Sequence, residues 1–253
     1  MAHYDSYVIC TSPRSGSTLL CDLLTQTDVA GRPNSHFHRP SIDAWLDTYK
    51  LERDADKSER VVLGEIFQHA IERGTGGTGL FGLRLQRHSF DFFSEKLAVL
   101  HPGHPSDVDR FQAAFGRTLF IHLKRDDKVE QAISHVKAEQ TGLWHVAPDG
   151  TEIERNAAPK EPVYDSEAIR ARFDEASALD RQWEDWFSTE GIEPLRVSYH
   201  DLASDPPATL RRILEKLGLN GEAATGVEPG VAKLADKTSN DWARRFRSEL
   251  SAA

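Results

Sequence analysis

The sequence has few cysteines and no long apolar segment. Its only two cysteines are Cys10 and Cys21, which is too few for a disulfide framework or for a structural zinc site of about four ligands. No stretch approaches the roughly 18 apolar residues of a membrane span. The apolar run at residues 7–10 is too short for the core of a signal peptide. We therefore expect a cytoplasmic protein without a membrane span.

The chain also lacks an excess of positive charge. Its formal net charge is −9, whereas a protein that binds nucleic acid non-specifically is normally basic, because neutralising phosphates supplies most of its affinity. We therefore expect no nucleic-acid partner, and any anion site must be a local cluster of basic residues. The content of 39% hydrophobic and 28% charged residues is that of an ordinary globular protein.

Short apolar runs alternate with helical patterns along the chain. Residues 7–10, 80–85, 119–123 and 195–199 are compact β-prone runs, as expected of strands buried on both faces of a parallel sheet. Apolar residues at helical spacing follow at 19–24, 129–136, 169–187 and 210–217. This alternation predicts an α/β fold, a P-loop-like parallel sheet flanked by helices, in a single domain covering residues 1–253.

Two polar segments interrupt this pattern. Residues 101–116 are rich in His, Pro and Asp, and residues 145–164 are polar with several prolines and glycines. Long loops in compact domains are often functional. We expect both segments to be lid-like loops.

The strongest local motif follows the first predicted strand. Residues 11–18 read Thr-Ser-Pro-Arg-Ser-Gly-Ser-Thr. A sharp strand-to-helix turn directs several backbone N–H groups and the helix dipole toward one point, where an anion binds. Gly16 permits the tight turn, and Arg14 adds a planar cation suited to oxyanions. The alternative is an ordinary turn capped by Ser17 or Thr18.

This loop differs from two well-known phosphate loops. A Walker A motif needs two glycines five apart, followed by Lys and Ser or Thr, and this segment has no Lys. A tyrosine-phosphatase loop needs a nucleophilic Cys six positions before its Arg, whereas Cys10 lies four before Arg14, within the strand. Both cysteines are therefore expected to be buried, small apolar residues.

Taken together, the motifs resemble those of PAPS-dependent sulfotransferases, and in particular the Stf0 family of bacterial carbohydrate sulfotransferases. (PAPS is 3′-phosphoadenosine-5′-phosphosulfate.) Residues 11–20 resemble the 5′-phosphosulfate loop of these enzymes, and a strand that ends in Arg125, with Ser134 nine residues later, resembles the 3′-phosphate site. Residues 197–210 resemble the Tyr-x-Asp-Leu turn and Asp-Pro helix start of the family. The matches span residues 7–247.

The resemblance implies a set of nucleotide-binding residues. Residues 235–247 are similar to the Stf0 segment that closes over the nucleotide; a basic helix end that complements the helix dipole is the other interpretation. The residues implied to bind PAPS are Pro13, Arg14, Ser15, Gly16, Ser17, Thr18, Arg125, Ser134, Ser239, Trp242 and Arg245. For Arg125 alone, a surface ion pair with Asp126 or Asp127 is the alternative.

The sequence departs from the family where the catalytic base is expected. Stf0 enzymes have a glutamate shortly after a Gly-x-Pro motif; here Gly31-Arg32-Pro33 is followed by Asn34-Ser35-His36-Phe37-His38, and Ser35 takes the glutamate position. The unperturbed pKa of histidine, near 6.5, suits proton abstraction. His36 is thus the first candidate base and His38 the second, with Glu65 or a residue of 145–164 as further alternatives.

The expected reaction is transfer of a sulfuryl group from PAPS to a hydroxyl, giving a sulfate ester and PAP (3′-phosphoadenosine-5′-phosphate). The acceptor is a small molecule or glycan, for which a carbohydrate or glycolipid is favoured. Arg14 would stabilise the leaving phosphate as a catalytic residue, and Arg84, Trp144 and His145 are candidate acceptor-binding residues. No metal is expected. A small-molecule kinase or a nucleotide-binding module is the alternative, and the sequence does not decide between a monomer and a homo-oligomer.

Overall fold

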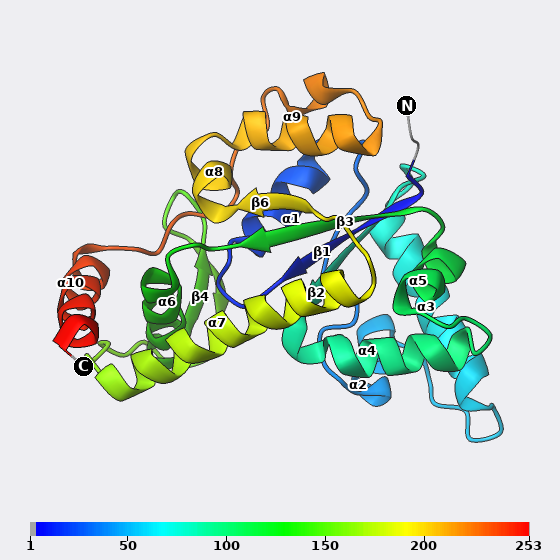
Figure 1. Ribbon diagram of the computed structural model, residues 1–253, viewed down its shortest axis with the longest axis horizontal. Helices are drawn as coiled ribbons and strands as arrows, with labels where there is room; N and C mark the ends of the chain where they lie inside the picture. The colour runs from blue at the N-terminus through cyan, green and yellow to red at the C-terminus, as the bar shows by residue number, and fades with distance from the viewer. Residues whose placement is uncertain (1–3, 253) are drawn as a thin grey trace.

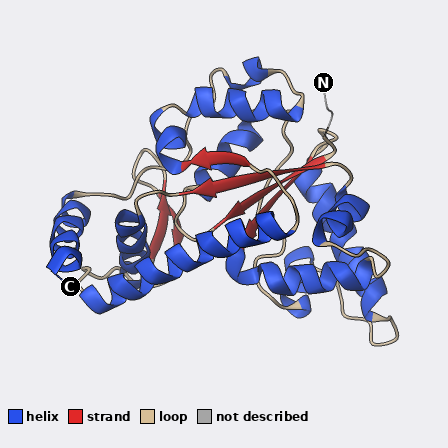
Figure 2. Cartoon of the chain, viewed as in Figure 1, coloured by secondary structure: helices blue, strands red, loops and turns tan. Residues whose placement is uncertain are grey.

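The computed structural model describes residues 4–252, which form one α/β domain around a parallel sheet (Figures 1 and 2). The strands are β1 (Ser6–Thr11), β2 (Phe81–Gln86), β3 (Thr118–Lys124), β4 (Leu143–Val146), β5 (Glu152–Arg155) and β6 (Leu195–Ser198). The helices are α1 (Ser17–Gln26), α2 (Ile42–Tyr49), α3 (Glu59–Thr75), α4 (Arg87–Leu100), α5 (Asp107–Phe115), α6 (Lys128–Thr141), α7 (Ser166–Thr189), α8 (Tyr199–Ser204), α9 (Pro206–Leu217), the 3₁₀ helix η1 (Gly221–Ala224) and α10 (Lys237–Ala252).

The central sheet has the order β2-β1-β3-β6, and every pairing in it is parallel. Its four strands coincide with the four apolar runs of the sequence, which confirms the predicted parallel sheet. Because the strands are parallel, their carboxyl ends all lie at one edge, which is where open α/β sheets bind ligands.

Successive residues of β1 serve opposite faces of the sheet. Tyr7 and Ile9 pack against α1, α8 and α9, whereas Val8 and Cys10 pack against the layer formed by α2, α3, α4, α5 and α7. This is the period of two expected of a strand. Figure 1 shows α9 on one side of the sheet and α7 running along the other.

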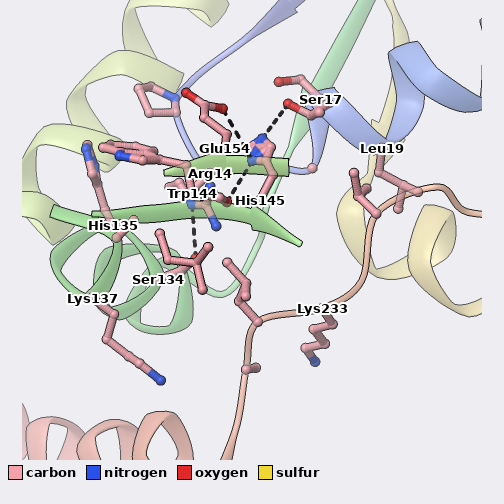
Figure 3. Close-up of a pocket in the computed structure, with 18 of the residues that line it drawn as sticks. Arg14, Ser17, Leu19, Ser134, His135, Lys137, Trp144, His145, Glu154 and Lys233 are labelled. Atoms are coloured by element: carbon pink, nitrogen blue, oxygen red, sulfur yellow. Dashed lines mark hydrogen bonds and ion pairs between the residues drawn. The ribbon is translucent and has the colours of Figure 1, made fainter. Parts of the chain in front are cut away.

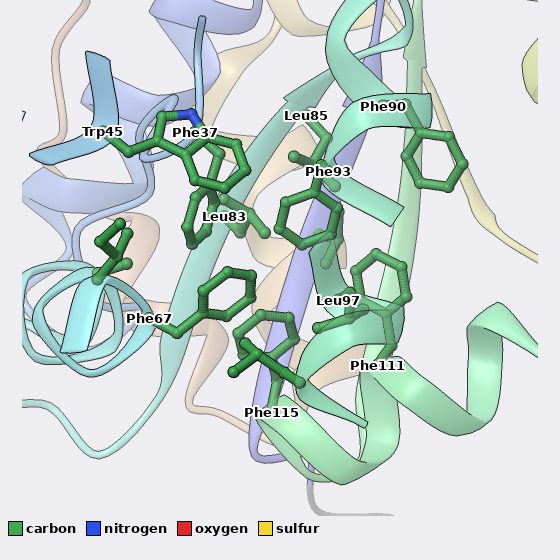
Figure 4. Packing of buried hydrophobic residues seen from close by; sticks show 14 of the residues in the cluster. Phe37, Trp45, Phe67, Leu83, Leu85, Phe90, Phe93, Leu97, Phe111 and Phe115 are labelled. Carbon is green, nitrogen blue, oxygen red and sulfur yellow. The ribbon is translucent and has the colours of Figure 1, made fainter. Parts of the chain in front are cut away.

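The second layer is rich in aromatic side chains. The rings of Phe67, Phe93, Phe111 and Phe115 pack against one another in stacked or tilted pairs, with ring centroids 5.6–6.5 Å apart (Figure 4). The fully buried Trp183 of α7 donates a hydrogen bond from Nε1 to the carbonyl oxygen of Thr11, at 2.8 Å. This bond fixes the end of β1, from which the phosphate loop begins.

The prediction of a loop at residues 101–116 was wrong for most of that segment. Helix α5 occupies Asp107–Phe115 and buries Phe111 completely. Ser106 caps it by accepting a hydrogen bond from the N–H of Asp109. Two phenylalanines four residues apart face the core, and this burial stabilises the helix despite the polar composition around it.

The second predicted loop is partly a β-hairpin. Strands β4 and β5 pair antiparallel as a separate two-stranded sheet, and residues 156–165 follow without regular structure. A third apolar cluster joins α6, α7 and α10, with Ile133, Ile169 and Phe246 at its centre. No helix within residues 4–252 is long and apolar enough to cross a membrane.

Candidate active site

A single large cavity, with a volume of about 1180 Å³, opens at the carboxyl edge of the central sheet. Residues that follow or end each of its four strands line the cavity: Pro13, Arg14 and residues 16–18 after β1, Gln86 on β2, Arg125 after β3 and Tyr199 after β6. Further parts of the wall come from α6, from the hairpin β4–β5 and from residues of the segments 34–38, 156–162 and 229–240. The fold therefore brings the predicted phosphate loop to the edge where ligands bind.

The backbone of the loop after β1 lacks the side-chain cap that the alternative interpretation required. Gly16 is the N-cap of α1, with φ 90° and no side-chain cap, so neither Ser17 nor Thr18 caps the helix as the alternative required. A Cβ atom at Gly16 would overlap the ring of Tyr199. Arg14 has φ 62°, an unusual value for a residue with a side chain. Such conformations cost about 1–3 kcal/mol and occur mainly at functional sites.

The side chain of Arg14 lies within the cavity. Its Nε donates to Ser134 Oγ at 3.1 Å, and its Nη1 donates to the carbonyl oxygen of Trp144 at 2.9 Å. Burial, and to a smaller extent the charge of Arg125, lower the pKa of Arg14 to about 10. Arg14 is still charged at neutral pH, and Figure 3 shows it pointing toward Ser134.

Arg125 and Ser134 both line the cavity, and their role at a 3′-phosphate stays a prediction. Arg125 is largely buried, stacks on Tyr199 with 4.7 Å between the guanidinium carbon and the ring centroid, and pairs with Glu130 at 2.6 Å. The ion pair with Asp126 or Asp127 considered above is absent from the described part of the chain. Arg14, Arg125 and Ser134, which come from three separate elements, thus line the same cavity.

A second polar group surrounds Thr18, at the first turn of α1. Arg84 donates to Thr18 Oγ1 at 3.0 Å and to Ser35 Oγ at 2.8 Å. His145 Nε2 is 2.8 Å from the same Thr18 Oγ1. Three of the predicted acceptor-binding residues, Arg84, Trp144 and His145, therefore line the cavity together.

The structure contradicts the choice of His36 as base. His36 does not line the cavity, is only 4% exposed, and stacks on Phe81. Its Nε2 lies 3.3 Å from the carbonyl oxygen of Arg32, which can only accept, so this nitrogen carries the proton. Burial lowers the pKa of His36 to about 4, too low for a base that works near neutral pH. His38 does line the cavity, and its role stays a prediction.

Several other predicted nucleotide-binding side chains are directed away from the cavity. Ser15 is buried, and its hydroxyl bonds to Thr11. Trp242 is buried in the cluster of α6, α7 and α10, and Arg245 stacks on Tyr164 with 3.8 Å between the guanidinium carbon and the ring centroid. Of the C-terminal segment, Ser239 does reach the cavity, where Lys137 donates to its Oγ at 2.8 Å.

Sequence reasoning missed several residues of the wall. Glu154, Lys137, Lys233 and Tyr199 line the cavity, and Figure 3 shows the first three. Basic side chains outnumber acidic ones there, in contrast to the net charge of the whole chain. The basic residues are Arg14, Arg84, Arg125, Lys137, Arg155, Lys160 and Lys233; the acidic ones are Glu130, Glu154, Glu161, Glu175 and Asp236. Among residues 4–252, no group of three or more His, Cys, Asp or Glu side chains is arranged to hold a metal ion.

The protein has a parallel sheet with a strand–loop–helix turn at its carboxyl edge, and arginines line the cavity beside this turn. This arrangement defines an α/β protein of the P-loop-like class. The profile of the Stf0 sulphotransferase family matches residues 6–249, and the chain belongs to this family. It is accordingly a sulfotransferase, as the motifs predicted.

The chain is also similar to individual proteins. The chain is 27% identical over 267 residues to the trehalose 2-sulfotransferase of Mycobacterium tuberculosis, covering 96% of this chain and 94% of that protein. It is 26% identical over 264 residues to the trehalose 2-sulfotransferase of Mycolicibacterium smegmatis, covering 98% and 96%. Among solved structures, a sulfotransferase from Alicyclobacillus acidocaldarius aligns over 100% of this chain and 91% of that one, with a TM-score of 0.48 and 14% identity.

Proposed function

We propose that this sulfotransferase transfers the sulfuryl group of PAPS to a hydroxyl of a carbohydrate, with a sulfate ester and PAP as products. The observation that carries the proposal is the convergence of the phosphate loop, Arg14, Arg125 and Ser134 on one cavity. Two separate phosphate-binding groups suit a nucleotide with phosphates at both its 5′ and 3′ positions. The names of the two mycobacterial relatives support a sugar as acceptor.

The residues present fit such a donor. The backbone N–H groups at the start of α1, together with Arg14, would hold the 5′-phosphosulfate. Arg125 and Ser134 would hold the 3′-phosphate. The Gly16 turn keeps the loop backbone free of side-chain atoms on the side of Tyr199. During transfer, negative charge grows on the leaving 5′-phosphate, and the fixed guanidinium of Arg14 would stabilise it without reorganisation.

Nucleotide preference tests the proposal. We expect PAP to raise the melting temperature of the protein strongly and ATP with Mg²⁺ to raise it much less, because a ligand that binds only the native state stabilises that state. Thermal shift at equal ligand concentrations measures both. Equal shifts, or a larger shift with ATP, would favour the kinase or nucleotide-module alternative instead. Labelled PAPS with a panel of mono- and disaccharides, trehalose included, then identifies the acceptor.

A pair of variants tests the 3′-phosphate site. Arg125→Ala should weaken PAP binding by about one to two decades, since losing a charged hydrogen-bond partner costs about 1.5–3 kcal/mol. Glu130→Gln should have the opposite effect, because Glu130 is the carboxylate that now holds Arg125 and a bound phosphate has to compete with it. Isothermal titration with PAP measures both affinities. An unchanged affinity in Arg125→Ala would refute the assignment.

A further inference from the structure

The position at which the family carries its glutamate base holds no base in this chain. Ser35 occupies that position, and its hydroxyl accepts a hydrogen bond from Arg84. The neighbouring His36 lies outside the cavity. A protein base for the acceptor hydroxyl must therefore come from another group near the phosphate loop.

The β4–β5 hairpin supplies a histidine and a carboxylate beside the loop. The two strands pair His145 directly with Glu154, and cross-strand neighbours lie on the same face of a hairpin. Glu154 Oε2 is 3.9 Å from His145 Nδ1, and both residues line the cavity. Figure 3 shows the two side chains next to each other, with Arg14 close by.

The hydrogen bonds around His145 determine which of its nitrogens is free. Nδ1 lies 2.7 Å from the carbonyl oxygen of Trp144, which only accepts, so Nδ1 carries the proton. Nε2 is then an acceptor, 2.8 Å from Thr18 Oγ1. The hydroxyl of Thr18 in turn accepts from Arg84, which leaves its own hydrogen to donate to Nε2. The network thus holds the unprotonated nitrogen of His145 at the first turn of α1.

We propose that His145 is the general base for the acceptor hydroxyl and that Glu154 positions it and stabilises its protonated form. The inference rests on the proposed function. The acceptor hydroxyl would take the place now held by Thr18 Oγ1 at Nε2. As the bond between the acceptor oxygen and sulfur forms, the bond from sulfur to the 5′-phosphate oxygen breaks. PAP leaves with that electron pair, the hydroxyl proton moves to Nε2, and the proton later passes to solvent.

The charges that face His145 come from three elements. Burial lowers its pKa from the usual value, and Arg14, from the phosphate loop, lowers it further; Glu154 on β5 raises it and Arg84 on β2 lowers it. His145 is therefore neutral at pH 7, as a base must be. Because a base works only when deprotonated, activity should fall as the pH decreases through a pKa below about 6.5. Removing the charge of Glu154 should lower the pKa of His145 further. The decrease in activity at low pH, which is the acid limb of the pH–rate profile, should then occur at lower pH.

Three variants test the assignment: His145→Gln, Glu154→Gln and, as a control, His101→Asn, which lies outside the cavity. His145→Gln should keep the PAP-induced thermal shift and lose about 10²–10⁴-fold in kcat, the usual contribution of a placed base. It should also lose the acid limb of the pH–rate profile. Glu154→Gln should have a smaller loss in kcat and an acid limb shifted to lower pH. The control should behave as wild type.

A second readout does not depend on the acceptor. Nitrogen-15 NMR of histidine-labelled protein should show His145 as the Nδ1-protonated tautomer at pH 7, and Glu154→Gln should lower its pKa. Glu154 is half-exposed, so this variant should fold. Kcat within threefold of wild type in His145→Gln, an acid limb that does not move in Glu154→Gln, or the opposite tautomer would each overturn the proposal. If PAP does not raise the melting temperature of the wild type, the proposed function itself is wrong.

Discussion

Replacing Arg14 by alanine is expected to reduce kcat by about 10²–10³-fold, the range seen when one oxyanion-stabilising donor is removed. The guanidinium of Arg14 is held within the cavity by Ser134 and by the carbonyl oxygen of Trp144, so it is fixed before the reaction begins. Its contact with the leaving phosphate strengthens as charge grows there, and the loss should therefore fall on turnover more than on PAP affinity. Steady-state kinetics at saturating PAPS, combined with PAP titration, separates the two effects.

The conservative variant Arg14→Lys is the matched comparison. Lysine keeps the charge but not the planar fork, and one ammonium group cannot reproduce both hydrogen bonds at their present positions. We expect its kcat to lie between those of wild type and Arg14→Ala. If Arg14→Ala loses PAP affinity as strongly as Arg125→Ala and keeps its kcat, then Arg14 serves ground-state binding, and the leaving-group role is wrong.

Gly16→Ala is expected to cost at least one decade in PAP affinity. A residue with a side chain at φ 90° is strained by about 1–3 kcal/mol, and here the new Cβ also overlaps the Tyr199 ring. That ring stacks on Arg125, so its displacement disturbs the 3′-phosphate site as well as the loop. Titration with PAP and the melting temperature of the free protein measure the two consequences.

Gly77→Ala is the control for backbone strain. Gly77 has φ 84°, and a Cβ there meets nothing within 4 Å. Gly77→Ala should lower the melting temperature, because its backbone strain is comparable to that of Gly16→Ala. It should leave the affinity for PAP unchanged. If Gly16→Ala binds PAP as tightly as Gly77→Ala does, the close approach of Tyr199 to the loop has no part in nucleotide binding.

Strands β1, β2 and β3 were predictable from the sequence because they are buried on both faces. Each then appears as a short, largely apolar run, and the loop after β1 has a recognisable order of residue types. Arg125 and Ser134 were singled out by the resemblance to the family; both line the cavity, and their role stays a prediction. The strands and the loop depend on the spacing of residues that are close together in the chain, and this spacing can be read directly from the sequence.

The features that were missed depend on which way a side chain points. His36 and His38 are two residues apart in a polar segment, and only packing against Phe81 decides that His36 is the buried one. Trp242 is likewise directed into the core by its neighbours on α6 and α7. The hairpin had a signal: Pro148-Asp149-Gly150 is a favourable turn sequence between two strand-forming segments. The hairpin is hard to recognise because each strand has only four residues and three of the four residues of β5 are charged.

The place of β1 at the middle of the sheet has a consequence for biosynthesis. Its two hydrogen-bonding partners, β2 and β3, both emerge from the ribosome after it, and β3 follows only once α2 to α5 have been made. Until β3 has been made, at least one edge of this apolar strand has no native partner, and such edges template aggregation. The nascent chain should therefore need chaperone protection at β1, and the loop that β1 anchors can reach its final form only when the later strands have arrived.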